Sequence, residues 1–442
     1  MSNIHPSLGR QLLAGSIWAF FAKVAAIAAA LTVHALLARM LEPDEFGTYI
    51  LASSVVVVSS IVASLGMNHV IVRLLGESHS VDRGQLSRTI ILRCTVIALI
   101  GAAIAAILIA GPPGHWLAER VFSSQLLTNC TAWVAVWLIA LTAQLMLAEA
   151  HRGVKDFRMA AILGGPLAGV GLAIMLLASL VLGVELNLKT AILLSAMSAL
   201  LVIPLGIWLI RKNTIAASGR FHLTPLQLAS IAGPMLVTSI TLVALNHADV
   251  WIVGIYLEKT DIALYGSAIQ LASLIGFPLL ILNSVVPPYV AELYKIDQHD
   301  QLQRELRRAT GIATYAAVAG FLVVVLLSGH LLRIVYGDFY QRAATVLIII
   351  AAGRLVSVCT GPCGIVLMMT GFHHVMMWVN IVAGAMSVLL MILVARPFGL
   401  QGIATVAALM IIAQNAAMLW LARIKSGVWT HAELSPRAIL SA

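Results

Sequence analysis

Charged residues are scarce in this chain of 442 residues: they make up 10% of it, against 61% apolar residues. A soluble domain of this length does not need so much apolar surface. Polar segments are short as well, because none exceeds about 25 residues, and the phosphate-binding pattern G-x-x-x-x-G-K-[ST] is missing. The sequence therefore excludes a soluble nucleotide-binding or catalytic domain.

Catalytic and metal-binding patterns are equally scarce. No two carboxylates are placed for acid–base chemistry on sugars, and no G-x-S-x-G motif occurs. The chain is therefore predicted not to be an enzyme, and a membrane glycosyltransferase or polymerase is the weaker class. All four cysteines (Cys94, Cys130, Cys359 and Cys363) fall in or at the edge of apolar runs, which favours packed small residues over a disulfide framework or a metal site.

The apolar residues form repeated runs of about 20 residues, long enough to cross about 30 Å of hydrocarbon as helices. The first run has no cleavage site after it and is predicted to be a retained span. We predict an all-α polytopic membrane protein of about twelve transmembrane helices, at residues 12–38, 46–66, 88–110, 129–150, 159–183, 189–210, 227–257, 262–286, 309–328, 343–368, 372–395 and 402–423.

One pattern occurs in both halves of the chain. The residues of Leu41-Glu42-x-x-Glu45-x-x-x-Tyr49 match Leu257-Glu258-x-x-Asp261-x-x-x-Tyr265, and every matched pair is separated by the same distance along the chain. An offset near half the chain length is typical of the internal repeats of transporters. We therefore predict two pseudo-symmetric six-helix bundles, residues 1–210 and 227–442, joined by a cytoplasmic linker at 211–226.

The net charge of +9 is explained by short basic loops rather than by nucleic-acid binding. Apart from three that lie well inside spans, 17 of the Lys and Arg residues lie at the termini or in and beside the even-numbered loops, and 7 lie in or beside the odd-numbered loops. Because positive loops stay in the cytoplasm, both termini are predicted to be cytoplasmic. In the loop at 291–308, Pro287-Pro288 is expected to end the eighth span, and Leu302 and Leu306 indicate a short amphipathic helix at the membrane surface.

Glycine–proline pairs interrupt several predicted spans, at Gly165-Pro166, Gly233-Pro234 and Gly361-Pro362. Each proline removes a backbone donor and bends its helix. The bends could serve conformational change or be static kinks, and the sequence does not distinguish these two interpretations.

Three basic residues lie well inside predicted spans: Lys23, Arg93 and Arg354. A charge at mid-span costs roughly 2.5–3.5 kcal/mol on insertion scales, so it needs a purpose. Lys23 shares a helical stripe with Ser16 and His34, which is expected to face a polar cavity. Arg354 lies near the centre of its span, whereas Arg93 lies close enough to a helix end to extend to the membrane surface.

The acidic counterpart is Asp249, which lies in span seven next to Asn246 and His247. A carboxylate inside a span beside a histidine is a candidate site for proton or sodium coupling. The alternative is a structural ion pair between Asp249 and a basic residue of the other half. No cofactor is predicted beyond such a coupling ion, H⁺ or Na⁺.

The first repeat, with Gly15-Ser16-x-Trp18, Lys23, Leu37-Ala-Arg39-Met-Leu-Glu-Pro43-x-Glu45-Phe-Gly47-x-Tyr49 and Ser64-Leu-Gly66, resembles Wzx-type polysaccharide flippases of the MATE-like MOP superfamily. The second half agrees through Asp249, Leu264-Tyr265 and Pro287-Pro288-Tyr-Val-Ala-Glu292. The resemblance covers nearly the whole chain. It implies two six-helix bundles around a central cavity, and it does not identify the cargo.

The function that this resemblance implies is the flipping of undecaprenyl-pyrophosphate-linked oligosaccharides across the bacterial inner membrane, for O-antigen, capsule or exopolysaccharide synthesis. Membrane lipids and the polysaccharide polymerase and export machinery are then the expected partners. A basic site of Lys23, Arg354, Arg93 and His34 would suit the pyrophosphate. The alternative is a MATE-like cation-coupled drug antiporter, which predicts more carboxylates in the first half; a non-transporting scaffold is a third hypothesis.

Overall fold

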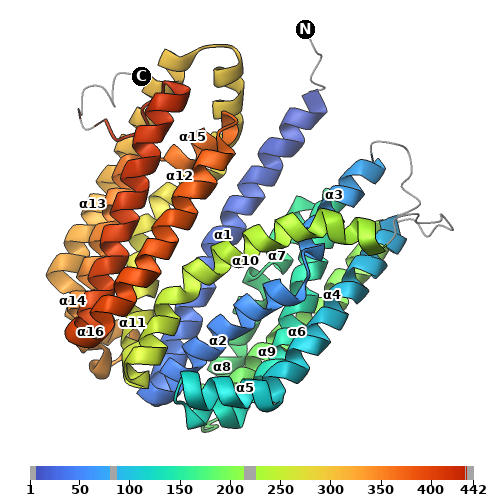
Figure 1. The fold of residues 1–442 in the computed structure, drawn as a ribbon, viewed down its shortest axis with the longest axis vertical. Coiled ribbons are helices and arrows are strands. Elements are labelled where there is room, and N and C mark those ends of the chain that lie inside the picture. The colour runs from blue at the N-terminus through green and yellow to red at the C-terminus, as the bar shows by residue number, and fades with distance from the viewer. Residues whose placement is uncertain (1–5, 80–86, 214–224, 434, 436–442) are drawn as a thin grey trace. The chain divides into compact units, whose positions relative to one another are not determined.

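The computed structural model describes residues 6–79, 87–213, 225–433 and 435. These residues are almost entirely helical, and no strand occurs among them. The prediction of an all-α membrane protein is therefore confirmed. The chain, drawn in Figure 1, forms two compact units, residues 1–247 and residues 248–442.

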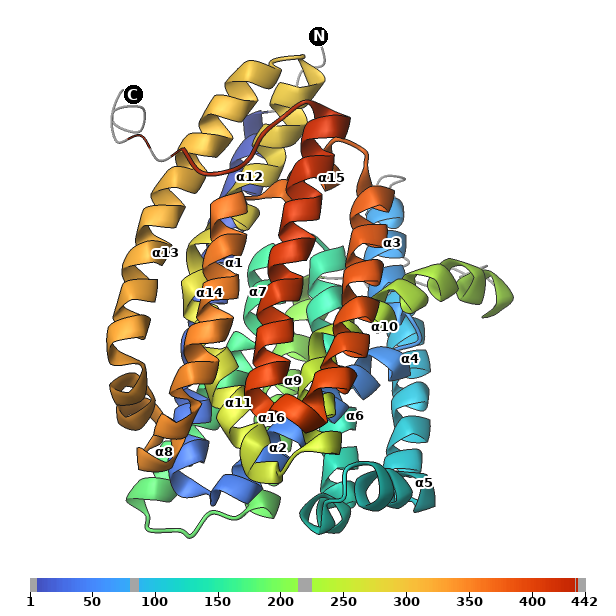
Figure 2. The ribbon, with the colours of Figure 1, turned by 60° about the vertical axis from the view of Figure 1, so that its left-hand side comes forward.

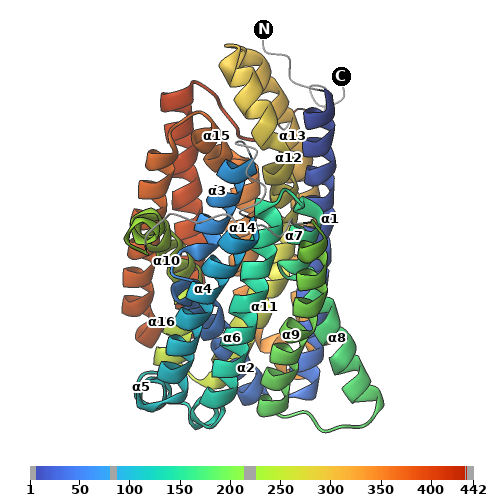
Figure 3. The same ribbon diagram turned by 90° about the vertical axis from the view of Figure 1, so that its right-hand side faces the viewer.

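The first unit contains six spans, several of which are interrupted. Its elements are α1 (Pro6–Met40), α2 (Pro43–Ala63), α3 (Met67–His79), α4 (Ser87–Ala110), α5 (Pro112–Trp116), the π-helix η2 (Leu117–Val121), α6 (Gln125–Gly153), α7 (Phe157–Leu163), α8 (Pro166–Val181), α9 (Leu188–Asn213) and the start of α10 (Pro225–Tyr256). Helix α6 packs against α2, α4 and α9, as Figure 3 shows. Its buried side chains therefore form the centre of this unit.

Among the described residues, five spans lie wholly in the second unit, which also holds the end of α10. After the end of α10 come α11 (Lys259–Ala272), η3 (Ser273–Gly276), α12 (Phe277–Lys295), α13 (His299–Tyr336), η4 (Asp338–Ala343), α14 (Ala344–Thr360), α15 (Cys363–Met369) and α16 (His373–Ser426). Helix α16 changes direction at Gly399 (φ 56°, ψ −144°), which divides it into two helical arms. The two arms lie side by side in Figure 2. Gln414 on one arm donates to the Asn380 Oδ1 on the other at 2.6 Å.

Among the described residues, ten helical segments are long and apolar enough to cross a membrane. Counting α16 as two arms and adding α10, which covers the predicted span 227–257, gives the twelve predicted spans. The chain is therefore a multi-pass membrane protein, as its composition indicates.

The repeat in the sequence reappears in the helix boundaries. Helix α1 ends at Met40 and α10 ends at Tyr256, the residues directly before the two copies of the repeat. Glu42 is then the N-cap of α2, and Glu258 is the N-cap of α11, at the same offset. The two halves therefore make the same helix–turn–helix at equivalent positions of the sequence.

The third residue of each second helix has diverged between the halves. In α11, Asp261 accepts from the backbone N–H of Glu258 at 3.3 Å and completes a capping box. In α2, the equivalent Glu45 instead accepts from the backbone N–H of Leu188 at 3.2 Å, and so caps the start of α9. The longer side chain of Glu45 thus accepts a hydrogen bond from the first turn of a neighbouring helix instead of from its own helix.

The boundary between the compact units lies inside α10, between His247 and Ala248. Most of the sequence-based linker, residues 211–226, lies outside the described residues. The first part of α10 belongs to the first unit because it packs there: Ala232 is buried in that unit's core, and Ser239 hydrogen-bonds to the His69 Nε2 at 2.9 Å. Helix α10 therefore connects the two units.

Two expectations for the loop at 291–308 are wrong. Pro287-Pro288 does not end the helix, because α12 continues to Lys295. A proline removes only its own donor, and the other backbone bonds of the helix hold. Leu302 and Leu306 do not form a separate surface helix but begin α13, and both are buried in the core of the second unit. Leu302 and Leu306 do form an apolar helix face, as predicted, but this face packs in the core of the second unit and not against the membrane surface.

A C-terminal strap, residues 427–433, follows α16 and crosses the start of α13 and the end of α14 (Figure 2). Thr430 Oγ1 donates to the Thr360 carbonyl at 2.7 Å, and the Ala432 N–H donates to the Cys359 carbonyl at 2.9 Å. These carbonyls lie in the last turn of α14, where the helix supplies no donors. The strap thus replaces hydrogen bonds lost where the helix breaks at Gly361, which has a φ of 73°.

An ion pair also holds the strap against α13. The Arg307 Nη2 lies 2.8 Å from the Glu433 Oε2, and the Glu433 N–H donates to the Arg307 carbonyl at 3.0 Å. The Trp429 N–H donates to the Gln303 Oε1 at 2.9 Å. Burial lowers the pKa of His431, and the nearby Arg307 lowers it further, while Glu433 partly opposes the shift.

The lowered pKa of His431 predicts that the strap docks less tightly in acid. When the strap is released, His431 regains an ordinary pKa of about 6.5 and takes up a proton more readily than when docked. Binding of that proton therefore favours release as the pH falls below about 6.5. Amide hydrogen exchange of the strap in detergent should accelerate at pH 5.5 relative to pH 7.5, beyond the intrinsic change in exchange rate. His431→Gln should remove this pH dependence, and His374→Gln, at an exposed histidine, should keep it. An unchanged pH dependence in His431→Gln would contradict the assignment.

Candidate functional site

A carboxylate occupies the centre of the candidate site in the second unit. Asp249, near the end of α10, is half-buried, and each of its oxygens accepts one hydrogen bond. The backbone N–H of Val250 donates to Oδ1 at 2.8 Å, and the hydroxyl of Tyr265 donates to Oδ2 at 3.2 Å. The carboxylate is therefore held in one orientation between α10 and α11.

Tyr265 is fully buried in the second turn of α11. The capping box of Glu258 and Asp261 starts this helix and fixes its first turn, directly before the tyrosine. The turn between the helices thus carries the tyrosine from the end of α10 back against Asp249, which lies 16 residues earlier. The repeated acidic turn therefore positions this hydroxyl.

Arg354, on α14, is the basic side chain of this site. It lies near enough to Asp249 for the two opposite charges to attract each other. Its aliphatic stem lies beside η3: the Arg354 Cδ is 3.9 Å from the position that a Cβ would take at Gly276. The Arg354 Nε is buried and has no hydrogen-bond partner among the described residues. Part of the guanidinium is therefore left to bind another acceptor.

The arrangement joins three helices of the second unit around one negative charge. Burial disfavours an ionised carboxylate, whereas the two donors and the guanidinium favour it. A cation or a proton that reaches Asp249 would compete with these groups. The site can therefore respond to an ion by loosening or tightening the contact between α10, α11 and α14.

The basic residues predicted in the first unit lie on two different helices, α1 and α4. Lys23 is exposed on α1, and Arg93 is exposed in the second turn of α4. His34 is half-buried on α1, where its ring meets the ring of Phe46 edge-on at 6.0 Å. The His34 Nδ1 is buried without a hydrogen-bond partner among the described residues. The side chain of Ser16, predicted to share the stripe, lies outside those that the structure describes.

The structure brings together two residues for which separate roles are expected from the sequence. Arg354 was predicted to bind substrate and Asp249 to bind the coupling ion, yet they share one cluster. Of the residues predicted beside Asp249, His247 is half-buried and Asn246 is exposed. The sequence did not single out Tyr265 as a site residue, although Tyr265 occupies the same position of the repeat as Tyr49 does in the first half. The helix packing that aims its hydroxyl at Asp249 could not be read from that position.

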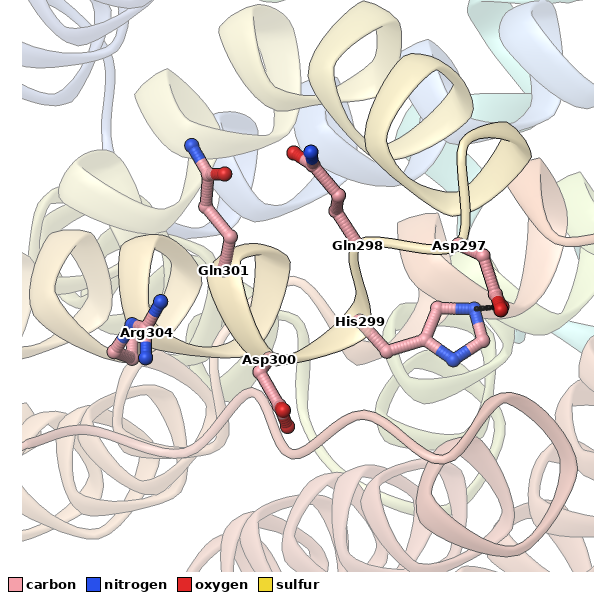
Figure 4. A pocket seen from close by; sticks show the side chains of 6 residues that line it. All are labelled: Asp297, Gln298, His299, Asp300, Gln301 and Arg304. Carbon is pink, nitrogen blue, oxygen red and sulfur yellow. Dashed lines mark ion pairs between the residues drawn. The ribbon is translucent and has the colours of Figure 1, made fainter.

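A separate surface depression of about 540 Å³ lies at the turn between α12 and α13 (Figure 4). In it, the ring of His299 stacks on Tyr294 at 4.7 Å, and its Nε2 lies 3.5 Å from Asp297 Oδ1. The lining is polar throughout: Asp297, Gln298, His299, Asp300, Gln301 and Arg304. Because this depression is open and lies at a turn between helices, whereas Asp249 and Arg354 are charges within apolar helices, we place the candidate site at Asp249.

The sequence matches a protein-family model described as polysaccharide biosynthesis protein, over residues 36–345. This match covers most of the chain, including Asp249 and Tyr265. The chain belongs to the polysaccharide biosynthesis protein family. No curated protein matches the sequence.

Solved structures share the fold at low sequence identity. An inward-facing multidrug resistance MATE family transporter of the MOP superfamily matches with a TM-score of 0.72 and 14% identity, over 90% of this chain and 94% of that one. The lipid II flippase MurJ, in an inward closed conformation, matches with a TM-score of 0.61 and 14% identity, over 94% and 89%.

A MOP superfamily transporter from Pyrococcus furiosus, whose binding pocket is described as having reverse polarity, matches with a TM-score of 0.63 and 11% identity, over 94% and 95% of the two chains. At these identities the likeness concerns the fold. The polysaccharide biosynthesis protein therefore has the MOP transporter fold, which confirms the family and fold expected from its sequence.

The cluster predicts a measurable coupling between Asp249 and Arg354. Arg354→Met keeps the stem and removes the charge, so Asp249 loses its compensating cation. We expect a loss of about 1–2 kcal/mol in the free energy of unfolding, below the range for a fully buried ion pair, because both side chains are only half-buried. Asp249→Asn combined with Arg354→Met should recover most of this loss in a double-mutant cycle measured by unfolding in detergent.

The control for this cycle is Arg333→Met. Arg333 is an exposed arginine that lies 2.8 Å from the exposed Asp338, and its loss should cost less than about 1 kcal/mol. A coupling energy of zero between Asp249 and Arg354 would show that the two charges are energetically independent.

Proposed function

We propose that this protein is a flippase, not an enzyme, which translocates an undecaprenyl-pyrophosphate-linked oligosaccharide across the bacterial inner membrane. The oligosaccharide would serve surface polysaccharide synthesis: O-antigen, capsule or exopolysaccharide. The observation that carries this proposal is membership of the polysaccharide biosynthesis family together with a transporter fold. A lipid-linked sugar is the polysaccharide precursor that a multi-pass transporter is suited to move, since its tail can stay in lipid. The polysaccharide polymerase and export machinery are then the proposed partners.

Arg354 is the proposed ligand of the pyrophosphate in the second unit. Its guanidinium lies in an apolar span and keeps a buried Nε without a partner among the described residues. Charge-assisted hydrogen bonds to phosphate are strong where water is excluded, and arginine forms them in pairs. In the first unit, Lys23, Arg93 and His34 remain proposed substrate-binding residues, each to be tested separately.

Asp249 is the proposed site of ion coupling, by H⁺ or Na⁺, with His247 and Asn246 beside it. An ion shifts a conformational equilibrium only through a difference in its affinity for the two states. Asp249 offers such a difference because its contacts join three helices of the second unit, and their geometry changes if those helices move. Neutralising the carboxylate would also release Arg354 toward an anionic cargo.

A MATE-like antiporter for cationic drugs is the second candidate. The observation in its favour is the same carboxylate at Asp249, which suits a cation as well as it suits coupling. The first unit offers less support for it. Glu149 lies near the end of α6, where both of its oxygens accept hydrogen bonds from the Arg152 Nη1, at 2.8 and 2.9 Å. A carboxylate already neutralised in this way is a poor ligand for a cationic drug.

The proposed role of Arg354 is tested by flipping of a fluorescent undecaprenyl-pyrophosphate oligosaccharide in proteoliposomes. Arg354→Met should slow flipping roughly tenfold or more, because one charge-assisted hydrogen bond is lost. Arg333→Met should keep the wild-type rate. If Arg354 only neutralises Asp249, the double variant with Asp249→Asn will flip as fast as Asp249→Asn alone; if Arg354 binds cargo, the double variant will flip more slowly than Asp249→Asn alone. Transport of a cationic dye but not of the lipid would favour the antiporter instead.

The proposed orientation has both termini in the cytoplasm, from the excess of 17 over 7 basic residues on one side. Single cysteines introduced at Lys259 and at Lys425 should then react with a membrane-impermeant thiol reagent on opposite sides of the inner membrane. The label should reach position 259 in intact spheroplasts and position 425 only after lysis. Labelling of position 425 in intact spheroplasts would reverse the topology.

A further inference from the structure

Each half of the chain carries a buried tyrosine at the equivalent position of its second helix. Tyr49 lies in α2 and Tyr265 in α11, at the same offset as the two N-caps Glu42 and Glu258. Tyr49 is 3% exposed and Tyr265 is fully buried. A buried phenol needs a hydrogen-bond partner, so the partner of each hydroxyl shows what that half uses it for.

The two partners differ in charge. In the first unit, the Tyr49 hydroxyl lies 2.9 Å from the Ser195 Oγ on α9, and its ring stacks on Trp137 at 5.7 Å. In the second unit, the Tyr265 hydroxyl donates to the carboxylate of Asp249 at 3.2 Å. The same residue thus meets a neutral alcohol in one half and an ionisable group in the other.

A tyrosine that donates to a carboxylate responds to the charge of that carboxylate. The hydrogen bond is charge-assisted while Asp249 is ionised and weakens when a proton or a cation neutralises it. An arriving ion therefore competes with the hydroxyl for the negative charge of Asp249. No such competition exists at Tyr49, because Ser195 does not ionise.

We infer that Tyr265 is a positioning residue that sets the ion concentration at which Asp249 responds, and that the ion response resides in the second unit alone. This inference rests on the proposed coupling role of Asp249. The titratable and charged groups around Asp249 are Tyr265 from α11 and Arg354 from α14, with His247 two residues earlier on α10. Tyr265 is the neighbour that donates to the side-chain oxygen Oδ2, the oxygen left open by Val250.

The experiment measures flipping in proteoliposomes as a function of the coupling ion, with protons and sodium titrated separately. Tyr265→Phe removes the competing donor, so half-maximal flipping should need roughly tenfold less ion. Tyr49→Phe is the matched control, because it removes the same atom at the equivalent position of the other half. It should leave the ion dependence at the wild-type value.

Two further variants keep the outcomes distinct. Asp249→Asn should abolish the ion dependence; if it keeps the wild-type dependence, the proposed coupling itself fails. If Asp249→Asn abolishes the dependence but Tyr265→Phe leaves the half-maximal concentration unchanged, the inference about Tyr265 alone is overturned. An equal shift in Tyr49→Phe would overturn it too.

Should Tyr265→Phe fail to fold, a fluorinated tyrosine at position 265 replaces it. This analogue keeps the shape of the side chain and strengthens the hydroxyl as a donor. It should therefore raise the ion concentration needed for half-maximal flipping. A lowered or unchanged concentration would contradict the role.

Discussion

Every backbone polar group inside the membrane must find its partner within the protein, and this constraint shapes both units. It is most demanding where a helix breaks, since carbonyls then lose their donors. In the first unit, α7 ends before Gly164, and the Gln144 amide donates to the Leu163 carbonyl at 2.8 Å. In the second, α14 ends before Gly361, and the C-terminal strap supplies the donors. The strap also passes so close that a Cβ at Gly361 would collide with the Thr430 carbonyl, which makes glycine necessary there.

The same constraint explains what the sequence could predict. Span positions follow from apolar length, and two of the three glycine–proline pairs, at 165–166 and 361–362, do coincide with helix breaks. The third pair, at 233–234, lies inside the continuous α10. A proline ends a helix only when the neighbouring packing also allows the chain to turn. That packing depends on residues distant in sequence, which local patterns do not contain.

The candidate site was predictable to a similar degree. A charge within an apolar span is a strong signal, so Asp249 and Arg354 could both be named as candidates from the sequence. Their proximity was not predictable, because they lie on α10 and α14, helices that are far apart along the chain with three long helices between them. Tyr265 was visible only as a repeated residue. Its role depends on the direction of its hydroxyl, which the packing of α11 determines. Sequence thus locates unusual charges, whereas their partners require the fold.

The divergence of the two halves bears on mechanism more directly than their similarity does. The repeat keeps the turn, with Glu42 and Glu258 as N-caps, and it keeps the tyrosine. What has changed is the set of groups that the repeated residues contact. Glu45 caps α9 and Tyr49 meets Ser195, so in the first half both residues join α2 to α9. In the second half, Asp261 caps its own helix, and Tyr265 meets a carboxylate on the preceding helix. The first half therefore uses the repeat to fix one helix against another by neutral and capping hydrogen bonds. The second half leaves the equivalent contact dependent on a charge, which is the property that a switch requires.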